Sequence, residues 1–358
     1  MEIPKLNFSP NVIEKVKAGK RLCFEDGLEL FKSTDVLTIG RMAQDVRERL
    51  HGRRVFYSIN LHLNHTNICT TRCGFCAFSR DAGMPDAYAL TLDEIEDRVN
   101  EAIQRWNINE VHIVGGHNPE LGMDYYTGML RRIRSISREI YIKAFSATEI
   151  DDIAKRSELE TEDVLKRFQE AGLNSLPGGG AEIFDPEIRR QICPEKISGE
   201  RWLEIHRTAH RLGIKTNATM LYGVGESDEA RVAHLLKLRE LQDETGGFSA
   251  FVPLVYNSGK DGTGTSGYLD LKVLSISRLL LDNIPHIKVH WPATGLKFAL
   301  AALFFGIDDI GGTNFSERVM RETGSRSPHR LSSEQLVRCI REAGYEPCLV
   351  DSSYLKAH

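Results

Sequence analysis

Three cysteines fall within eight positions of the sequence, Cys69, Cys73 and Cys76 in NICTTRCGFCAFSR. The chain has seven cysteines, an odd number, and a chain of 358 residues needs no disulfides, so we interpret them as free thiols in a reducing compartment. A structural zinc ion needs four protein ligands, usually from two paired motifs. A histidine of the preceding segment could be the fourth ligand, but the sequence has no second pair of cysteines or histidines at zinc spacing. An iron–sulfur cluster held by three thiolates would leave one iron without a protein ligand. Such an iron is free to bind another molecule.

Glycine runs follow two of the apolar segments. HIVGGHNP places Gly115 and Gly116 where backbone can approach a ligand closely, because no Cβ intervenes. PGGGAEIFDPEIRRQI (177–192) repeats the pattern and adds Glu182 and Arg189. A carboxylate accepts hydroxyl or ammonium donors, and a guanidinium binds a carboxylate with two parallel hydrogen bonds. We therefore expect both side chains at a ligand.

A few polar side chains stand within or just after predicted strands. Asn217 and Tyr222 lie in TNATMLYG, near the mouth of the predicted fold, and His62 lies in the first strand. An amide buried in a strand is costly unless it is hydrogen-bonded, so a substrate or a neighbouring side chain is expected beside Asn217. These three residues are our candidates for catalysis, although any one of the twelve histidines more often has a structural role.

The elements that must position these residues alternate along most of the chain. After about fifty residues of helical pattern, short apolar or β-branched runs alternate with amphipathic helical segments. TLDEIEDRVNEAIQRW opens on Thr91 with Glu94 three positions later, the pattern of a capping box. The expected strands are 57–63, 110–116, 140–146, 175–179, 215–223, 248–255, 286–291 and 308–312.

Strand and helix repeated seven or eight times predict an α/β fold with parallel strands. The count favours a TIM-type (β/α) barrel, near-complete (βα)8, over a short open sheet. We expect an N-terminal helical extension over residues 1–52 and the barrel, with C-terminal helices, over 53–358. Chemistry in such barrels gathers at the carboxyl ends of the strands, where the cysteines fall. The polar, glycine-rich stretch 256–268 is either a mobile loop over the mouth or a plain surface loop.

The bulk composition excludes several classes of function. The chain carries 46 Lys plus Arg against 50 Asp plus Glu, so no strong overall charge attracts nucleic acid or anionic lipid. The N-terminal residues lack the pattern of a signal peptide, and the run FALAALFFGI is too short to span a bilayer. We expect a cytoplasmic protein with a small-molecule partner, bound to neither nucleic acid nor membrane.

The spacing C-x3-C-x2-C with an aromatic residue, Phe75, before the last cysteine resembles the signature of the radical S-adenosylmethionine superfamily. The resemblance implies a 4Fe-4S cluster on Cys69, Cys73 and Cys76 whose remaining iron chelates S-adenosylmethionine. It also implies an external one-electron donor such as flavodoxin or ferredoxin. The cofactor contacts that we expect are Phe75, Phe78, Gly115, Gly116, Ser146, Glu182 and Arg189.

Segments along nearly the whole chain, among them LPGGGAEIF, ERWLEIHRTAHRLGIKTNATMLYG and DDIGGT, resemble the branch of that superfamily that acts in menaquinone and deazaflavin biosynthesis. Within it the chain is most similar to aminofutalosine synthases. This implies addition of the 5'-deoxyadenosyl radical to 3-[(1-carboxyvinyl)oxy]benzoate, with rearrangement and decarboxylation, to form 6-amino-6-deoxyfutalosine. Cyclic dehypoxanthinylfutalosine synthase and deazaflavin-precursor synthase remain alternatives within the branch. A zinc-stabilised binding protein is the alternative from another class.

Overall fold

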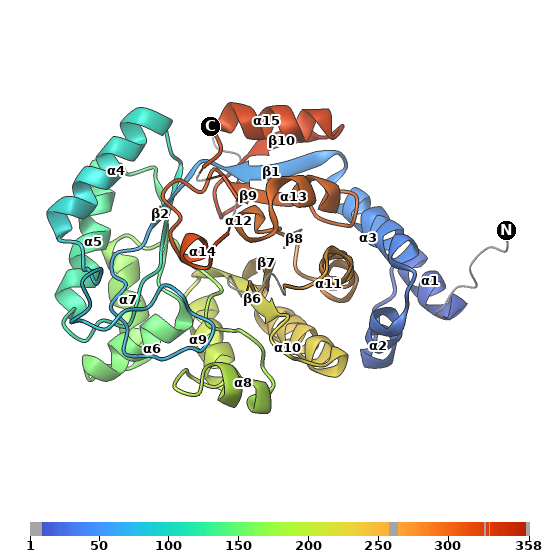
Figure 1. Ribbon diagram of the computed structural model, residues 1–358, viewed down its shortest axis with the longest axis horizontal. Coiled ribbons are helices and arrows are strands. Elements are labelled where there is room, and N and C mark those ends of the chain that lie inside the picture. Colours follow the sequence, from blue (N-terminus) through green and yellow to red (C-terminus); the bar gives the residue numbers. More distant parts are fainter. Residues whose placement is uncertain (1–8, 258–263, 326, 329, 356–358) are drawn as a thin grey trace.

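A computed structural model describes residues 9–257, 264–325, 327–328 and 330–355 of the chain (Figure 1). Its central element is a parallel sheet in which neighbours along the chain are neighbours in space, in the order β2-β3-β4-β5-β6-β7-β8. The strands are β1 (Arg54–Ser58), β2 (Asn60–Leu63), β3 (Glu110–Ile113), β4 (Tyr141–Ala144), β5 (Ser175–Leu176), β6 (Lys215–Tyr222), β7 (Phe248–Val255), β8 (His286–Ile287), β9 (Asp309–Gly312) and β10 (Glu346–Leu349).

Helices surround this sheet and supply the crossovers between its strands (Figure 1). They are α1 (Pro10–Lys17), α2 (Phe24–Lys32), α3 (Val36–His51), α4 (Leu92–Trp106), α5 (Met123–Ile136), α6 (Ala147–Arg156), α7 (Thr161–Ala171), α8 (Pro186–Ile192), α9 (Gly199–Arg211), α10 (Asp228–Thr245), α11 (Gly267–Leu280), α12 (Trp291–Thr294), α13 (Leu296–Ala302), α14 (Val319–Glu322) and α15 (Ser333–Glu342).

The sheet continues through β9 into a ring. A parallel bridge between Lys288 and Asp309 joins the residue after β8 to β9, and β1 pairs in parallel with β9 and with β10. A bridge between Leu61 and Phe315 joins β2 to the residues after β9. The prediction of a TIM-type α/β barrel is thereby confirmed. The segment expected as one strand, 57–63, is instead two strands in separate sheets, β1 and β2.

Local sequence explains where several helices begin and end. The Thr91 hydroxyl accepts the backbone N–H of Glu94, whose carboxylate accepts the N–H of Thr91, so the predicted capping box starts α4. Gly172 follows α7 with φ 114°, a conformation that glycine adopts without steric cost. Pro177 follows the two-residue β5 and has no N–H for a ladder, in keeping with a strand shorter than the predicted 175–179.

The N-terminal helices α1 to α3 lie at one side of the ring, where α3 packs on α11 and α2 packs on α10 (Figure 1). One continuous cluster of buried apolar residues includes Val12 of α1 and Ile310 of β9. The division into residues 1–52 and 53–358 stays a prediction. Within the part of the chain that the structure describes, no helix combines the length and apolarity needed to cross a membrane. Of the predicted loop 256–268, residues 258–263 lie outside the described residues, and α11 begins at Gly267.

Candidate active site

The cavity of interest opens inside the barrel at the carboxyl ends of the strands and has a volume of about 370 Å³. Strands β2, β3, β4, β6 and β7 and the loops that follow them contribute side chains to its wall. Eleven of the thirteen predicted site residues line it, namely His62, Cys69, Cys73, Phe75, Cys76, Phe78, Gly115, Gly116, Ser146, Glu182 and Asn217. The structure therefore brings together residues that stand up to 155 positions apart in the sequence.

The cysteines lie in the loop between β2 and α4, whose path main-chain hydrogen bonds fix. The N–H of Cys69 donates to the Arg80 carbonyl at 3.1 Å, closing the loop on itself. The N–H of Gly74 donates to the Ile192 carbonyl at 2.8 Å, so the end of α8 anchors the middle of the loop. All three thiols are partly exposed and face the cavity.

The donor set of this loop is three thiols, which bind metal as thiolates. Burial raises the pKa of Cys73 to about 12 and also raises that of Cys69, so a cation must displace their protons. One zinc ion with Zn–S bonds of about 2.3 Å holds its sulfurs within about 4.6 Å of one another. Among the described residues, the group of three such ligands with donor atoms within 4.8 Å of one another is His51, His286 and Asp308, not the cysteines. The three thiols as they stand are therefore not arranged around a single zinc ion.

Gly115 and Gly116 leave room for other parts of the protein. A Cβ on Gly116 would lie 2.1 Å from the carbonyl oxygen of Ile68, and a Cβ on Gly115 would lie 2.4 Å from Nε2 of His65. The N–H of Gly116 donates to the carbonyl of Thr66 at 3.0 Å. The cysteine loop therefore packs directly on the end of β3. The predicted contact of these glycines with a cofactor stays a prediction, although both line the cavity.

Ser146 begins α6 and lies in the cavity wall. Its hydroxyl and N–H both donate to Oε2 of Glu149, at 2.7 and 2.8 Å, and the other carboxylate oxygen accepts the N–H of Gly115 at 3.0 Å. Glu149 is buried and thus ties the end of β3 to the start of α6. The capping box explains why the fold needs Ser146, whatever it contacts in the cavity.

Sequence reasoning missed Lys196, which forms a buried ion pair with Glu182. The Lys196 ammonium lies 2.5 Å from Oε1 of Glu182 and 5.2 Å from the centre of the Phe75 ring. Burial alone would lower the pKa of Lys196, but Glu182 and Cys73 outweigh it and the pKa is raised. Both members of the pair line the cavity beside the cysteine loop. Lys196 stands in a turn after α8, and the sequence there carries no pattern that marks a site.

Two predicted residues do not reach the cavity. The Arg189 guanidinium donates to the main-chain carbonyls of Ala181 at 2.5 Å, Ile183 at 3.2 Å and Gly180 at 3.3 Å, and to that of Ile197. It is buried and holds the glycine-rich loop in shape. That Arg189 binds a ligand carboxylate stays a prediction.

Tyr222 is the second predicted residue that lies outside the cavity. Asn217, Thr219 and Leu221 of β6 line the cavity, and side chains along a strand alternate between its faces. Tyr222 has the opposite parity and lies against α11, where its hydroxyl bonds with Asp270. It is therefore outside the cavity, and its role in catalysis stays a prediction.

The interior wall below the cysteine loop is polar, and its two histidines carry no charge. The rings of His62 and His112 stack with centres 4.7 Å apart, on neighbouring strands in register. Burial lowers the pKa of His62 to about 3 and that of His112 well below its usual value. Both imidazoles are therefore neutral near pH 7 and can each offer one donor and one acceptor.

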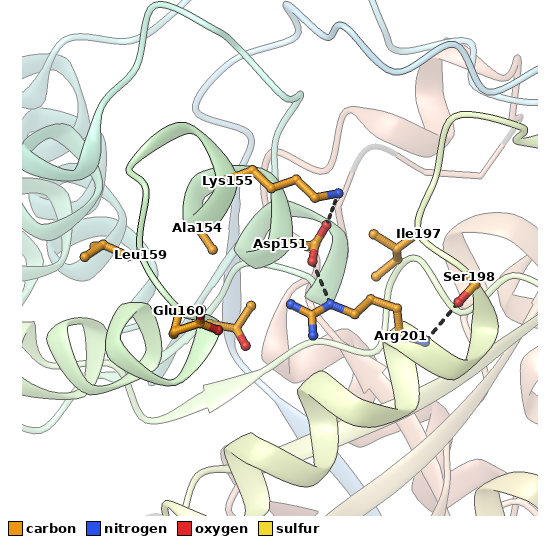
Figure 2. Close-up of a pocket in the computed structure, with 9 residues that line it drawn as sticks. Asp151, Ala154, Lys155, Leu159, Glu160, Ile197, Ser198 and Arg201 are labelled. Atoms are coloured by element: carbon orange, nitrogen blue, oxygen red, sulfur yellow. Dashed lines mark hydrogen bonds and ion pairs between the residues drawn. The ribbon is translucent and has the colours of Figure 1, made fainter.

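A second hollow, of about 460 Å³, lies on the outside of the barrel between α6, α7 and α9 (Figure 2). Its centre is the buried carboxylate of Asp151, paired with Lys155 at 2.7 Å and with Arg201 at 2.8 Å. Both cations are thus already paired with carboxylates, Arg201 with Glu204 as well, and none of the predicted site residues lines the hollow. The chemistry therefore belongs to the interior cavity.

The comparisons with known proteins agree with this geometry. Residues 63–238 match the sequence model of the radical SAM superfamily, and residues 245–357 match that of the CofH/MqnC C-terminal region. The chain is 42% identical to an aminodeoxyfutalosine synthase of Thermus thermophilus, over 96% of this chain and 94% of that protein.

Two further relatives have other activities. A 5-amino-6-(D-ribitylamino)uracil–L-tyrosine 4-hydroxyphenyl transferase of Methanopyrus kandleri is 39% identical, with 87% of each chain covered. A cyclic dehypoxanthine futalosine synthase of Halalkalibacterium halodurans is 35% identical, over 96% of this chain and 93% of that protein.

Among solved structures, the [FeFe]-hydrogenase maturase HydG superposes with a TM-score of 0.76 at 18% identity, over 96% of this chain and 76% of that one. This likeness concerns the fold. Together with the sequence matches over nearly the whole length, it shows that the chain is an enzyme of the radical SAM superfamily, whose members use a 4Fe-4S cluster and S-adenosylmethionine.

Proposed function

We propose that the protein is an aminodeoxyfutalosine synthase. The observation that carries this proposal is the 42% identity to the Thermus thermophilus enzyme along nearly the full length of both chains. The reaction joins the 5'-deoxyadenosyl group of S-adenosylmethionine to 3-[(1-carboxyvinyl)oxy]benzoate, with rearrangement and loss of carbon dioxide. It gives 6-amino-6-deoxyfutalosine and free methionine.

Cys69, Cys73 and Cys76 hold the cluster in this proposal, and their number leaves one iron for the cofactor. When bound, the cluster supplies the electron that cleaves the sulfonium of S-adenosylmethionine. An external one-electron donor in the cytoplasm, such as flavodoxin or ferredoxin, reduces the protein to its active state. The Lys196–Glu182 pair complements a zwitterionic ligand. Its ammonium can bind the ligand's carboxylate, and its carboxylate can bind the ligand's ammonium. We assign the methionine end of the cofactor to this pair.

The remaining space suits an aromatic dicarboxylate. Val252 and Leu254 give the wall an apolar part for the ring, and Lys143, Lys288 and His290 line the same cavity. Enclosure by the strands shields a reactive intermediate from water and from other partners. The neutral His62 beside them donates or accepts a hydrogen bond without adding charge.

The proposal is tested by product analysis. Anaerobically reconstituted, reduced protein is incubated with S-adenosylmethionine and the enol ether, and products are separated by mass. We expect 6-amino-6-deoxyfutalosine and an equal amount of methionine. Turnover of dehypoxanthine futalosine, or of tyrosine with ribitylaminouracil, in place of the enol ether would reject the proposal. Protein isolated with one zinc per chain instead of about four iron and four sulfide would reject the cluster as well.

A further inference from the structure

The amino-terminal end of the barrel is filled by two buried ion pairs. The Lys143 ammonium lies 2.7 Å from Oε1 of Glu110, and the Lys288 ammonium lies 3.2 Å from Oδ2 of Asp309. The carboxylates come from the first residues of β3 and β9, at the far end from the cysteines. Both lysines line the cavity, whereas neither carboxylate does. We call these four side chains the floor of the cavity.

Residues 350–354, the tail segment, run beneath this floor after β10. The N–H of Val350 donates to the carbonyl of Tyr57 at 2.9 Å, and the Asn109 side chain donates to the Val350 carbonyl at the same distance. These bonds fix the start of the tail segment to β1 and to the residue before β3.

Two side chains of the tail segment contact the floor. The N–H of Ser352 donates to Oε2 of Glu110 at 2.8 Å, and the Ser352 hydroxyl accepts the Lys143 ammonium at 2.7 Å. The Tyr354 hydroxyl donates to Oδ2 of Asp309 at 2.6 Å.

The backbone of Tyr354 is itself unusual. Its φ is 59°, in the left-handed region that costs a non-glycine residue free energy. Its ring stacks on His286 with centres 3.6 Å apart. Contacts at both ends of the side chain hold the residue in this conformation.

The hydrogen-bonding capacity that the floor leaves for a ligand is on its ammonium groups. Both oxygens of Glu110 are engaged, by Lys143 and Ser352, and both oxygens of Asp309 are engaged, since Oδ1 accepts the N–H of Gly311 at 2.6 Å. An ammonium has three donors. Lys143 uses two of them on Glu110 and Ser352, which leaves one for a group in the cavity. The floor therefore presents donors and no free carboxylate oxygen.

From this arrangement we propose that Lys143 and Lys288 bind the two carboxylates of the substrate, and that Ser352 and Tyr354 are positioning residues for them. The inference rests on the proposed function, because that function supplies a dicarboxylate. The Ser352 hydroxyl holds Lys143 toward the tail segment, and the Tyr354 hydroxyl holds Asp309, the partner of Lys288, in the same way. The unused ammonium donors of both lysines then point into the cavity. Without the Tyr354 hydroxyl, Oδ2 of Asp309 has the Lys288 ammonium as its one remaining partner among these residues and competes with the substrate for it.

The test is a binding titration of holoenzyme without reductant, so that no turnover occurs. The enol ether and S-adenosylmethionine are titrated separately into wild type, Ser352→Ala, Tyr354→Phe and the control Ser353→Ala. Among the described residues, the Ser353 hydroxyl bonds with Asp351 and with the N–H of Leu355. We expect the Kd of the enol ether to rise about tenfold in the first two variants and to stay unchanged in the control. The Kd of S-adenosylmethionine stays unchanged in all of them, and Ser352→Thr restores the affinity for the enol ether.

Steady-state kinetics give a second readout. A positioning role predicts a raised KM for the enol ether with kcat little changed. Equal loss of affinity for both ligands would indicate general damage to the fold and would overturn the inference, as would enol ether affinities equal to wild type. Wild-type protein that neither binds nor converts the enol ether would overturn the proposed function first, and the inference with it.

Discussion

Replacing Gly116 with alanine tests whether β3 holds the cysteine loop. The new Cβ would lie 2.1 Å from the Ile68 carbonyl oxygen and 2.9 Å from Cβ of Cys69, and real Cβ contacts are essentially never under 3.0 Å. The carbonyl must therefore retreat by about 0.9 Å. Because it is backbone adjacent to Cys69, the retreat moves a cluster ligand. Overpacking of this kind costs about 1–3 kcal/mol of unfolding free energy.

The assay compares Gly116→Ala with Gly122→Ala after identical anaerobic reconstitution. Gly122 has φ −89° and no atom within 4 Å of the position of an added Cβ, so its substitution changes composition without crowding. We expect Gly116→Ala to bind less iron and sulfide per chain, to give an altered electron paramagnetic resonance signal after reduction, and to unfold at lower denaturant. Iron content, spectrum and stability equal to those of Gly122→Ala would refute the packing argument.

Four further predictions follow from the site. Cys73→Ala should lose both the cluster, measured as iron and sulfide, and the formation of 5'-deoxyadenosine. Lys196→Met should raise the Kd of S-adenosylmethionine at least tenfold and lower the unfolding free energy by about 3 kcal/mol, because Glu182 is left buried and unpaired; adding Glu182→Gln should recover stability but not affinity. His62 has a folded pKa of about 3 against 6.5 unfolded, so the unfolded state binds the extra proton and stability falls as pH drops below 6.5. His62→Gln should make that fall, followed by urea unfolding between pH 7.5 and 5, shallower by up to about 1.4 kcal/mol per pH unit. Tyr222→Phe should leave kcat and KM within twofold of wild type, since its hydroxyl lies outside the cavity.

The parts of the site that the sequence could predict are those with a local pattern. The cysteines are recognisable by spacing alone, and the parallel strand order placed them at the correct end of the barrel. The same rule brought Ser146 to the cavity, because Ser146 stands just after β4. Asn217 also lines the cavity, but it lies in the amino half of β6, where the rule does not apply.

What the sequence could not predict depends on orientation and on distant partners. A barrel strand is buried on both faces, so nothing in TNATMLYG says that Asn217 faces inward and Tyr222 outward. Arg189 and Lys196 are both cations near Glu182. Main-chain carbonyls bind the Arg189 guanidinium, whereas the Lys196 ammonium reaches the cavity. The contacts of the tail segment with Glu110 join residues 242 positions apart, beyond the reach of any local pattern.

The position of β1 between β9 and β10 has a consequence for synthesis of the protein. Phe56 pairs with Asp309, about 250 residues later in the chain. At about 5–20 residues per second, a ribosome takes roughly 10 to 50 s to supply that partner. During this interval the backbone N–H and C=O groups of an apolar strand have no partner strand. They can pair instead with a strand of another copy of the chain. We therefore expect slow production at low temperature, or with a chaperone present, to raise the yield of folded enzyme.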